Sequence, residues 1–145
     1  KVKFLVLCLI TTLLISSCSS PAVVEKLGKC SNQQSLVVEN HVGSQIDALA
    51  ANNWQRAYSF AAASFQESVS LEQFKQVINR QYLYLIFNEG FAFGDCKNTA
   101  QGINQIVVID FQGRKRTLSY DLTLIAERLG VVAATEISVA DEVAT

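Results

Sequence analysis

Residues 103–124 read Ile-Asn-Gln-Ile-Val-Val-Ile-Asp-Phe-Gln-Gly-Arg-Lys-Arg-Thr-Leu-Ser-Tyr-Asp-Leu-Thr-Leu, and this stretch decides the fold. Its first part, residues 103–111, is an apolar run that predicts a strand buried on both faces in the middle of a sheet. Gln112 and Gly113 then form a turn signal. The second part alternates polar with apolar residues, as a strand does when one sheet face meets the core. The apolar positions of this second strand are Leu118, Tyr120, Leu122 and Leu124.

Further strands are predicted on both sides of this pair. Residues 82–87 are rich in aromatic and branched side chains, and the turn signal Asn88-Glu89-Gly90 separates them from a candidate strand at residues 91–97. A turn at residues 98–102 leads into the central pair, and a last candidate strand covers residues 131–139. Together these segments predict a curved antiparallel sheet.

The residues before the sheet have helical spacing. Apolar side chains three and four residues apart predict one helix that ends near residue 52 and a second that begins at Trp54. The first stripe consists of Val38, Val42, Ile46 and Leu49, and the second of Trp54, Ala57, Tyr58 and Ala61. A third helix has a sharper start, because Ser70 and Gln73 have the spacing of a capping box. Three amino-terminal helices packed on an antiparallel sheet make an α+β domain.

The first residues have the order of a bacterial export signal. Lys1 and Lys3 supply positive charge, and the apolar run at residues 4–15 is shorter than the roughly 20 residues that a membrane-spanning helix needs. The tetrad Ile15-Ser16-Ser17-Cys18 resembles the bacterial lipobox, in which the cysteine is acylated and becomes the new amino terminus. We therefore expect a lipid on Cys18. An ordinary secretory signal and an uncleaved anchor are the alternatives.

Domain boundaries and destination follow from this signal. We expect a signal peptide at residues 1–17, a tether at 18–34, one folded domain at 35–140 and a short tail at 141–145.

Two or three acyl chains hold a protein firmly on a membrane, because each buried methylene contributes about 0.8 kcal/mol to membrane binding. Ser19 is not the aspartate that retains lipoproteins at the inner membrane of enteric-type bacteria. In a Gram-negative source we therefore expect the periplasmic face of the outer membrane.

The charge of the chain argues against nucleic acid as a partner. The chain has 12 basic and 13 acidic residues, and removal of Lys1 and Lys3 leaves 10 basic residues, a net charge near −3. The basic cluster at residues 114–116 is interpreted as a solvated hairpin end, with a contact to anionic lipid or phosphate as the alternative.

Two cysteines remain after export. Cys8 is removed with the signal and Cys18 carries the lipid, which leaves Cys30 and Cys96. In an oxidising compartment a bond between them would close a long loop and stabilise the fold by about 4 kcal/mol. Two separate buried thiols are the alternative. Neither cysteine has a Cys-x-x-Cys neighbour, so a redox-active site is not expected.

The middle of the chain resembles the DUF4864 family of uncharacterised bacterial proteins. The resemblance covers roughly residues 45–135, and the Ala-Tyr-x-Phe-Ala segment at residues 57–61 is its most specific part. It rests on residues 46–49, 54–62, Phe74, Tyr82, 91–94 and 105–110. It implies an NTF2-like or SnoaL-like cone, also called cystatin-like, in which helices cover a curved sheet and often enclose a pocket. The family has no settled function to transfer.

Most catalytic and metal-binding patterns are missing from the sequence. His41 is the one histidine and is interpreted as a surface residue, and no serine lies in a Gly-x-Ser-x-Gly elbow. The remaining thiols and this imidazole do not form a recognised zinc or haem spacing. The glycines form neither GxGxxG nor a phosphate-binding loop. We expect no metal, no cofactor and no recognisable catalytic constellation.

Three classes of function follow. The leading expectation is a lipid-anchored envelope module that binds a small apolar ligand or a peptide, or assists a partner, in a pocket of the cone. The candidate pocket residues are Trp54, Tyr58, Tyr82, Tyr120 and Asp110. A structural or interaction role in an envelope complex is the alternative. The third class is an acid–base enzyme in which Asp110, inside an apolar wall, is the base and a tyrosine stabilises an oxyanion. Against it, an aspartate at a strand exit is commonly a turn acceptor.

Overall fold

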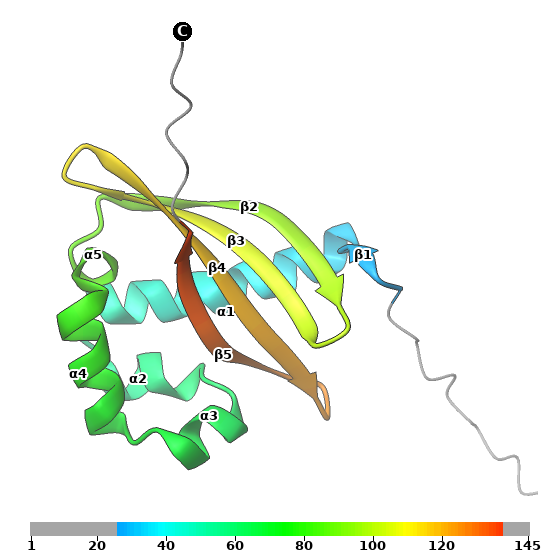
Figure 1. Cartoon of the computed structure of the whole chain (residues 1–145), viewed down its shortest axis with the longest axis horizontal. Coiled ribbons are helices and arrows are strands. Elements are labelled where there is room, and N and C mark those ends of the chain that lie inside the picture. Colours follow the sequence, from blue (N-terminus) through cyan, green and yellow to red (C-terminus); the bar gives the residue numbers. More distant parts are fainter. Residues whose placement is uncertain (1–25, 138–145) are drawn as a thin grey trace, which may run out of the picture.

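The computed structural model describes residues 26–137, which form an α+β domain (Figure 1). A short first strand precedes a group of helices, and four longer strands follow them. The helices are α1 (Asn32–Ala50), α2 (Trp54–Ser59), α3 (Ala63–Ser68), α4 (Leu71–Gln81) and α5 (Leu83–Ile86). The strands are β1 (Gly28–Lys29), β2 (Gly90–Thr99), β3 (Gly102–Phe111), β4 (Arg114–Ile125) and β5 (Arg128–Ile137). The predicted signal at residues 1–17, Cys18 and the tail at 141–145 lie outside the described residues.

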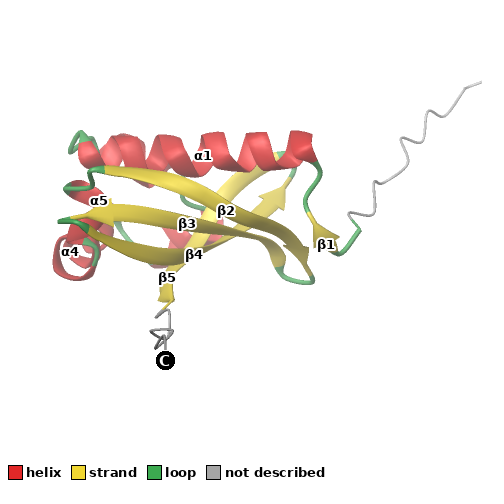
Figure 2. Ribbon diagram, turned by 90° about the horizontal axis from the view of Figure 1, so that it is seen from above, coloured by secondary structure: helices red, strands yellow, loops and turns green. Residues whose placement is uncertain are grey.

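The strands form one open antiparallel sheet in the order β1-β2-β3-β4-β5. Helix α1 runs across one face of this sheet, and α2 to α5 gather around the carboxyl-terminal end of α1 (Figures 1 and 2). The predicted antiparallel sheet is therefore confirmed. Within residues 26–137 no helix has the length and apolar character to cross a membrane.

The core lies between the helices and the inner face of the sheet. On the two central strands it contains Ile103, Gln105, Val107, Ile109, Leu118, Tyr120 and Leu122. The predicted alternation of β4 is confirmed. The prediction that β3 is buried on both faces is wrong, because only every second residue is buried. Ile106 and Val108 point to the outer face, where they are half-buried.

The folded part begins earlier than the predicted limit of residue 34. Strand β1 pairs with β2, and the side chain of Ser31 accepts a hydrogen bond from the backbone N–H of Gln34 at 3.2 Å. Ser31 is thus the N-cap of α1, and this cap satisfies a donor that the first helical turn leaves unpaired. Residues 28–34 therefore belong to the domain rather than to the tether.

The predicted second helix is divided into α2 and α3. Between them, the N–H of Ala62 donates to the carbonyl of Val131 at 2.8 Å, and the N–H of Val131 donates to the carbonyl of Phe60 at 2.9 Å. This pairing with β5 holds residues 60–62 out of the helix. This division adds one helix to the three that were expected.

Residues 82–87, predicted to be a strand, instead form the single helical turn α5. The N–H of Phe87 donates to the carbonyl of Leu83 at 3.0 Å, and the turn buries Tyr84, Leu85 and Ile86. Strand propensity chiefly reports how well a side chain fits a half-buried surface, and here the helical turn places all three side chains in the core. The strand prediction is wrong for this reason.

The capping box at the start of α4 is confirmed. The Ser70 hydroxyl accepts from the N–H of Gln73 at 3.2 Å, and the Gln73 side chain accepts from the N–H of Ser70 at 2.8 Å. We expect Ser70→Ala to lower the free energy of unfolding by about 1 kcal/mol, because a backbone donor loses its acceptor. Urea unfolding measures the change. Ser64→Ala, at an exposed helical position, is the matched control and should change stability by less than about 0.5 kcal/mol.

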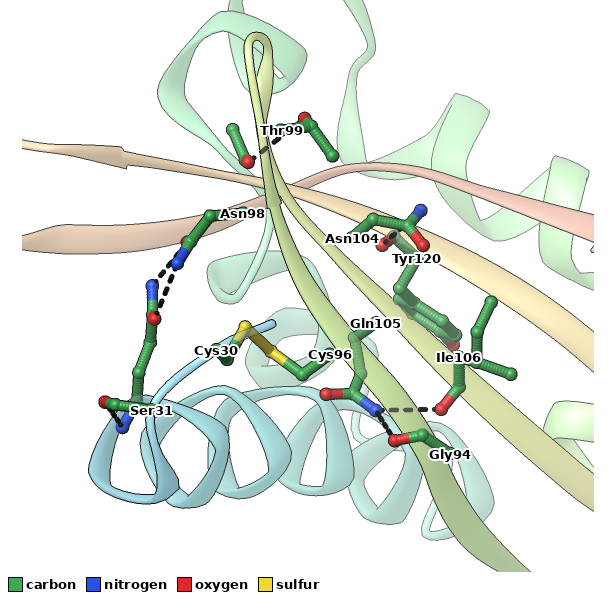
Figure 3. The surroundings of a disulfide bond; sticks show 12 residues. Cys30, Ser31, Gly94, Cys96, Asn98, Thr99, Asn104, Gln105, Ile106 and Tyr120 are labelled. Atoms are coloured by element: carbon green, nitrogen blue, oxygen red, sulfur yellow. Dashed lines mark hydrogen bonds between the residues drawn. A yellow bond between two sulfur atoms is a disulfide. The ribbon is translucent and has the colours of Figure 1, made fainter. Parts of the chain in front are cut away.

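Cys30 and Cys96 are joined by a disulfide (Figure 3). It links the residue after β1 to strand β2, and the two cysteines, which are 66 positions apart in sequence, have Cα atoms 5.4 Å apart. The N–H of Cys30 also donates to the carbonyl of Cys96 at 3.0 Å. All five described helices lie in the loop that the bond closes.

A β-bulge in β2 explains the one glutamine in the core of the sheet. The register of β2 and β3 shifts between Phe93 and Cys96. Such a bulge takes backbone groups out of the ladder. The buried Gln105 side chain donates from Nε2 to the carbonyl of Gly94 at 3.1 Å and so satisfies one of these groups (Figure 3).

Candidate ligand cavity

A cavity of about 210 Å³ lies between the helices and strands β4 and β5. The helices contribute side chains from α1, α3, α4 and α5, and β5 contributes four consecutive residues. The lining residues are Gln45, Leu49, Ala61, Phe65, Phe74, Val77, Ile78, Tyr82, Leu85, Tyr120 and residues 131–134. Most of these side chains are aliphatic or aromatic, so the cavity is an apolar environment.

Three polar side chains interrupt the apolar lining. Gln45 is 3 % exposed and donates from Nε2 to the carbonyl of Ala57 at 3.1 Å. The Tyr82 hydroxyl donates to the carbonyl of Ala134 at 2.8 Å. Tyr120 is 1 % exposed, and its hydroxyl forms no hydrogen bond with any residue that the structure describes. Of these three side chains, Tyr120 is therefore the one that forms no hydrogen bond with a described residue.

Burial keeps the Tyr120 hydroxyl protonated. Removal from water raises the pKa of Tyr120 above its ordinary value, and the nearby Tyr84 and Tyr82 raise it further. At neutral pH the group is thus a neutral hydroxyl that can donate one hydrogen bond and accept others. It is suited to a carbonyl or hydroxyl group of a bound molecule.

The Tyr120 hydroxyl leads to a prediction about stability. This hydroxyl faces the cavity and forms no hydrogen bond with a described residue, so we expect Tyr120→Phe to change the free energy of unfolding of protein refolded from urea by less than about 0.5 kcal/mol. Tyr82→Phe is the matched control, and it should lower this free energy by about 1 kcal/mol because the carbonyl of Ala134 loses its donor. If both variants are destabilised equally, the Tyr120 hydroxyl has a partner in the folded protein.

Two of the predicted pocket residues lie elsewhere. Trp54 packs against the edge of the core, with Lys75 Nζ 5.8 Å from the centre of its ring. The Tyr58 hydroxyl donates to the carbonyls of Val69 and Gln66 and so fastens α2 to α3. Neither side chain lines the cavity, and their expected pocket role is wrong because both support the helical layer.

Asp110 is also in the wrong place for a pocket base. It lies on the outer face of β3, its side chain is 44 % exposed, and Lys115 Nζ donates to its carboxylate at 2.7 Å. Together with the turn at Gln112 and Gly113, this pair forms the end of the β3–β4 hairpin. The expected proximity of Asp110 to the cavity tyrosines is therefore wrong.

His41 is half-buried rather than fully exposed. Its Nε2 lies 2.9 Å from the carbonyl of Phe60, and its ring meets the edge of the Phe60 ring at a centroid distance of 5.1 Å. The side chain thus supports the segment that divides α2 from α3. Among residues 26–137 no group of three or more histidine, cysteine, aspartate or glutamate residues could hold a metal ion.

Most residues of the cavity wall were not among the five candidate pocket residues, although the phenylalanines as a class were expected to contribute to a pocket. Phe65 and Phe74 of α3 and α4 line it, as does Gln45 of α1. Gln45 carried a usable signal, because it lies beside Ile46 and one turn before Leu49 on the buried stripe of α1. A polar side chain on such a stripe requires a partner or a cavity.

One of three comparisons with known proteins identifies the family. A search of curated proteins and a search of solved structures each found no match. The family model described as "Domain of unknown function (DUF4864)" matches residues 31–137, which is most of the chain and nearly all of the described fold. The protein therefore belongs to the DUF4864 family.

Proposed function

We propose that this protein is a lipid-anchored cell-envelope module, built as an NTF2-like cone, that binds a small and mostly apolar molecule in the cavity. The observation that carries the proposal is the Tyr120 hydroxyl, which lies at the wall of an apolar cavity and has no hydrogen-bond partner among the described residues. Apolar cavities with few polar groups are the usual form of small-molecule sites. The ligand we infer has an apolar body and one hydrogen-bonding group.

The size of the cavity limits the ligand. Drug-sized molecules occupy sites of about 300–1,000 Å³, and this cavity has about 210 Å³. The volume therefore favours a compact molecule, or a single apolar side chain of a peptide, over a long lipid or an extended peptide.

The proposed anchor rests on the sequence around Cys18. The charged start, the short apolar run and the tetrad at residues 15–18 occur in the order of a lipoprotein signal. Strand β1 begins at Gly28, so that a short stretch of chain separates the proposed lipid from the fold. The periplasmic face of the outer membrane is the proposed location in a Gram-negative source.

A structural role in an envelope complex is the second candidate. The outer face of the sheet favours it, because half-buried Ile106 and Val108 lie there among uncharged Thr117 and Ser119. A partner could pack against such a face. With Asp110 on this outer face, the enzyme hypothesis loses its base and is not proposed.

Ligand binding is tested on the full protein extracted from its own membrane. Native mass spectrometry should show a noncovalent mass that is lost under denaturing conditions. Ala134→Leu adds bulk at the wall of the cavity, and we expect at least a tenfold loss of the bound fraction. Ala92→Leu, on the outer face, is the matched control and should retain the mass. An empty wild-type protein, or one that carries a protein partner instead, would favour the structural role.

The anchor is tested with a pair of cysteine variants. Cys18→Ala should abolish acylation, so that the intact mass lacks acyl chains and the protein no longer sediments with membranes. Cys8→Ala changes a cysteine of the predicted signal and should leave acylation unchanged. An unmodified Cys18 in the mature wild-type protein would disprove the anchor.

A further inference from the structure

The exposed apolar side chains are concentrated at one end of the domain. Nine large hydrophobic side chains are exposed in the described chain, and five of them lie at the end formed by β1, the first turns of α1 and the β4–β5 hairpin (Figures 1 and 2). These five are Leu27, Leu36, Val37, Leu124 and Ile125. We call this region the apolar end. Exposed clusters of this kind usually mark an interaction surface.

The apolar end is hollowed by a shallow groove. Val37 and Val38 of α1 face Leu124 and Leu129 of the hairpin, and together with neighbouring residues they line a groove of about 250 Å³. Ile125 stands beyond the groove at the hairpin tip, where it is 66 % exposed. The groove is separate from the cavity at Tyr120, since the two share no lining residue.

We propose that the apolar end rests in the interfacial region of the membrane that carries the lipid anchor. This inference rests on the proposed acylation of Cys18. Gly28 is ten residues after Cys18, and ten residues span at most about 35 Å. The anchor therefore holds this end of the domain close to the bilayer. Apolar side chains that reach the boundary between headgroups and acyl chains gain the free energy of burial.

The charges at this end fit an anionic lipid surface. Lys26 and Lys29 flank the exposed Leu27, and Lys29 lies opposite Lys97 in the β1–β2 ladder. At the hairpin tip Arg128 lies opposite Ile125 and next to the exposed Glu127. The Asp95 carboxylate lies 3.7 Å from Lys97 Nζ. The unbalanced positive charge of this end is therefore that of Lys26 and Lys29. Each basic residue near an anionic bilayer strengthens binding through attraction to the lipid headgroups. Two such ends would bring their own Lys26 and Lys29 together in a symmetric dimer, and like charges repel. Apolar residues flanked by these lysines therefore favour an anionic lipid surface over a second copy packed end to end.

The test places a fluorescent label at each end of the domain. Ile125→Cys carries a nitrobenzoxadiazole label at the apolar end, and Gln76→Cys carries the same label on α4, at the other end (Figure 1). In mature protein, lipid on Cys18 and the disulfide leave the new cysteine as the one free thiol. The acylated protein is reconstituted in vesicles of phosphatidylethanolamine and phosphatidylglycerol. Quenching is measured with nitroxide-labelled lipid and with aqueous iodide.

We expect nitroxide lipid to quench the label at position 125 at least about twofold more than the label at position 76, and iodide to do the reverse. Equal quenching of the two labels by both agents would overturn the docking. Protection of position 125 from iodide without quenching by nitroxide lipid would also overturn it, and would indicate that protein covers the groove. The intact mass separates these results from failure of the anchor, because an unmodified Cys18 disproves acylation itself.

Discussion

Replacing Cys30 and Cys96 together by alanine should lower the free energy of unfolding by about 4 kcal/mol, because the unfolded chain loses a constraint that closes a loop of this length. The two residues are 66 positions apart, and all five described helices lie between them. The backbone hydrogen bond from Cys30 to Cys96 stays available to the variant. The native fold should therefore survive, and the loss should arise mainly from the freed unfolded chain. Urea unfolding followed by the fluorescence of Trp54, the single tryptophan, measures it.

Reduction provides the control for this prediction. A thiol reductant should bring the wild-type protein to within about 1 kcal/mol of the double variant and leave the double variant unchanged. If the variant retains wild-type stability, the bond does not form in the native protein. The two cysteines would then be the separate buried thiols that the sequence also allowed.

Features governed by neighbouring residues could be predicted from the sequence. The capping box of Ser70 and Gln73 needs only a spacing of three, and both of its hydrogen bonds form. The alternation of Leu118, Tyr120 and Leu122 needs only the two-residue period of a strand, and all three are buried. The sequence itself contains the partners of such contacts, so pattern alone identifies them.

Features governed by distant residues could not be predicted in this way. The division of α2 from α3 depends on Val131, about 70 residues after Phe60. The helical turn α5 packs against α4 and β3. The strand-like composition of residues 82–87 contains no information about these contacts. In both places tertiary contacts override a local preference, as they commonly do for short segments.

The same difference between local and distant determinants applies to the candidate site. Four of the candidate pocket residues were chosen because they are aromatic, and two of these four, Tyr82 and Tyr120, line the cavity. The face occupied by Asp110 depends on which set of alternate β3 residues points inward. That set is Ile103, Gln105, Val107 and Ile109. It holds a single polar residue, whereas the set with Asp110 holds two, and this difference was a weak signal that the carboxylate points outward.

Gly102→Ala should be the most damaging single substitution at the turns of the sheet, with a loss of about 4 kcal/mol in the free energy of unfolding. Two separate costs combine there. Gly102 has φ +143, a backbone conformation that costs other residues about 1–3 kcal/mol. A Cβ atom would also lie 2.2 Å from the carbonyl oxygen of Leu122 on β4. Relief requires β3 and β4 to move apart, and overpacking of this kind costs about 1–3 kcal/mol.

Gly90→Ala separates the two costs. Gly90 begins β2 with φ +145, almost the same conformation as Gly102, but a Cβ there meets no atom within 4 Å. The free energy of unfolding of this variant should fall only by the cost of the backbone conformation, about 1–3 kcal/mol. The difference between the two variants in urea unfolding is then the cost of forcing the strands apart beside Leu122. If they lose the same stability, the approach of Gly102 to Leu122 is looser in solution, and the tight contact between β3 and β4 is disproved.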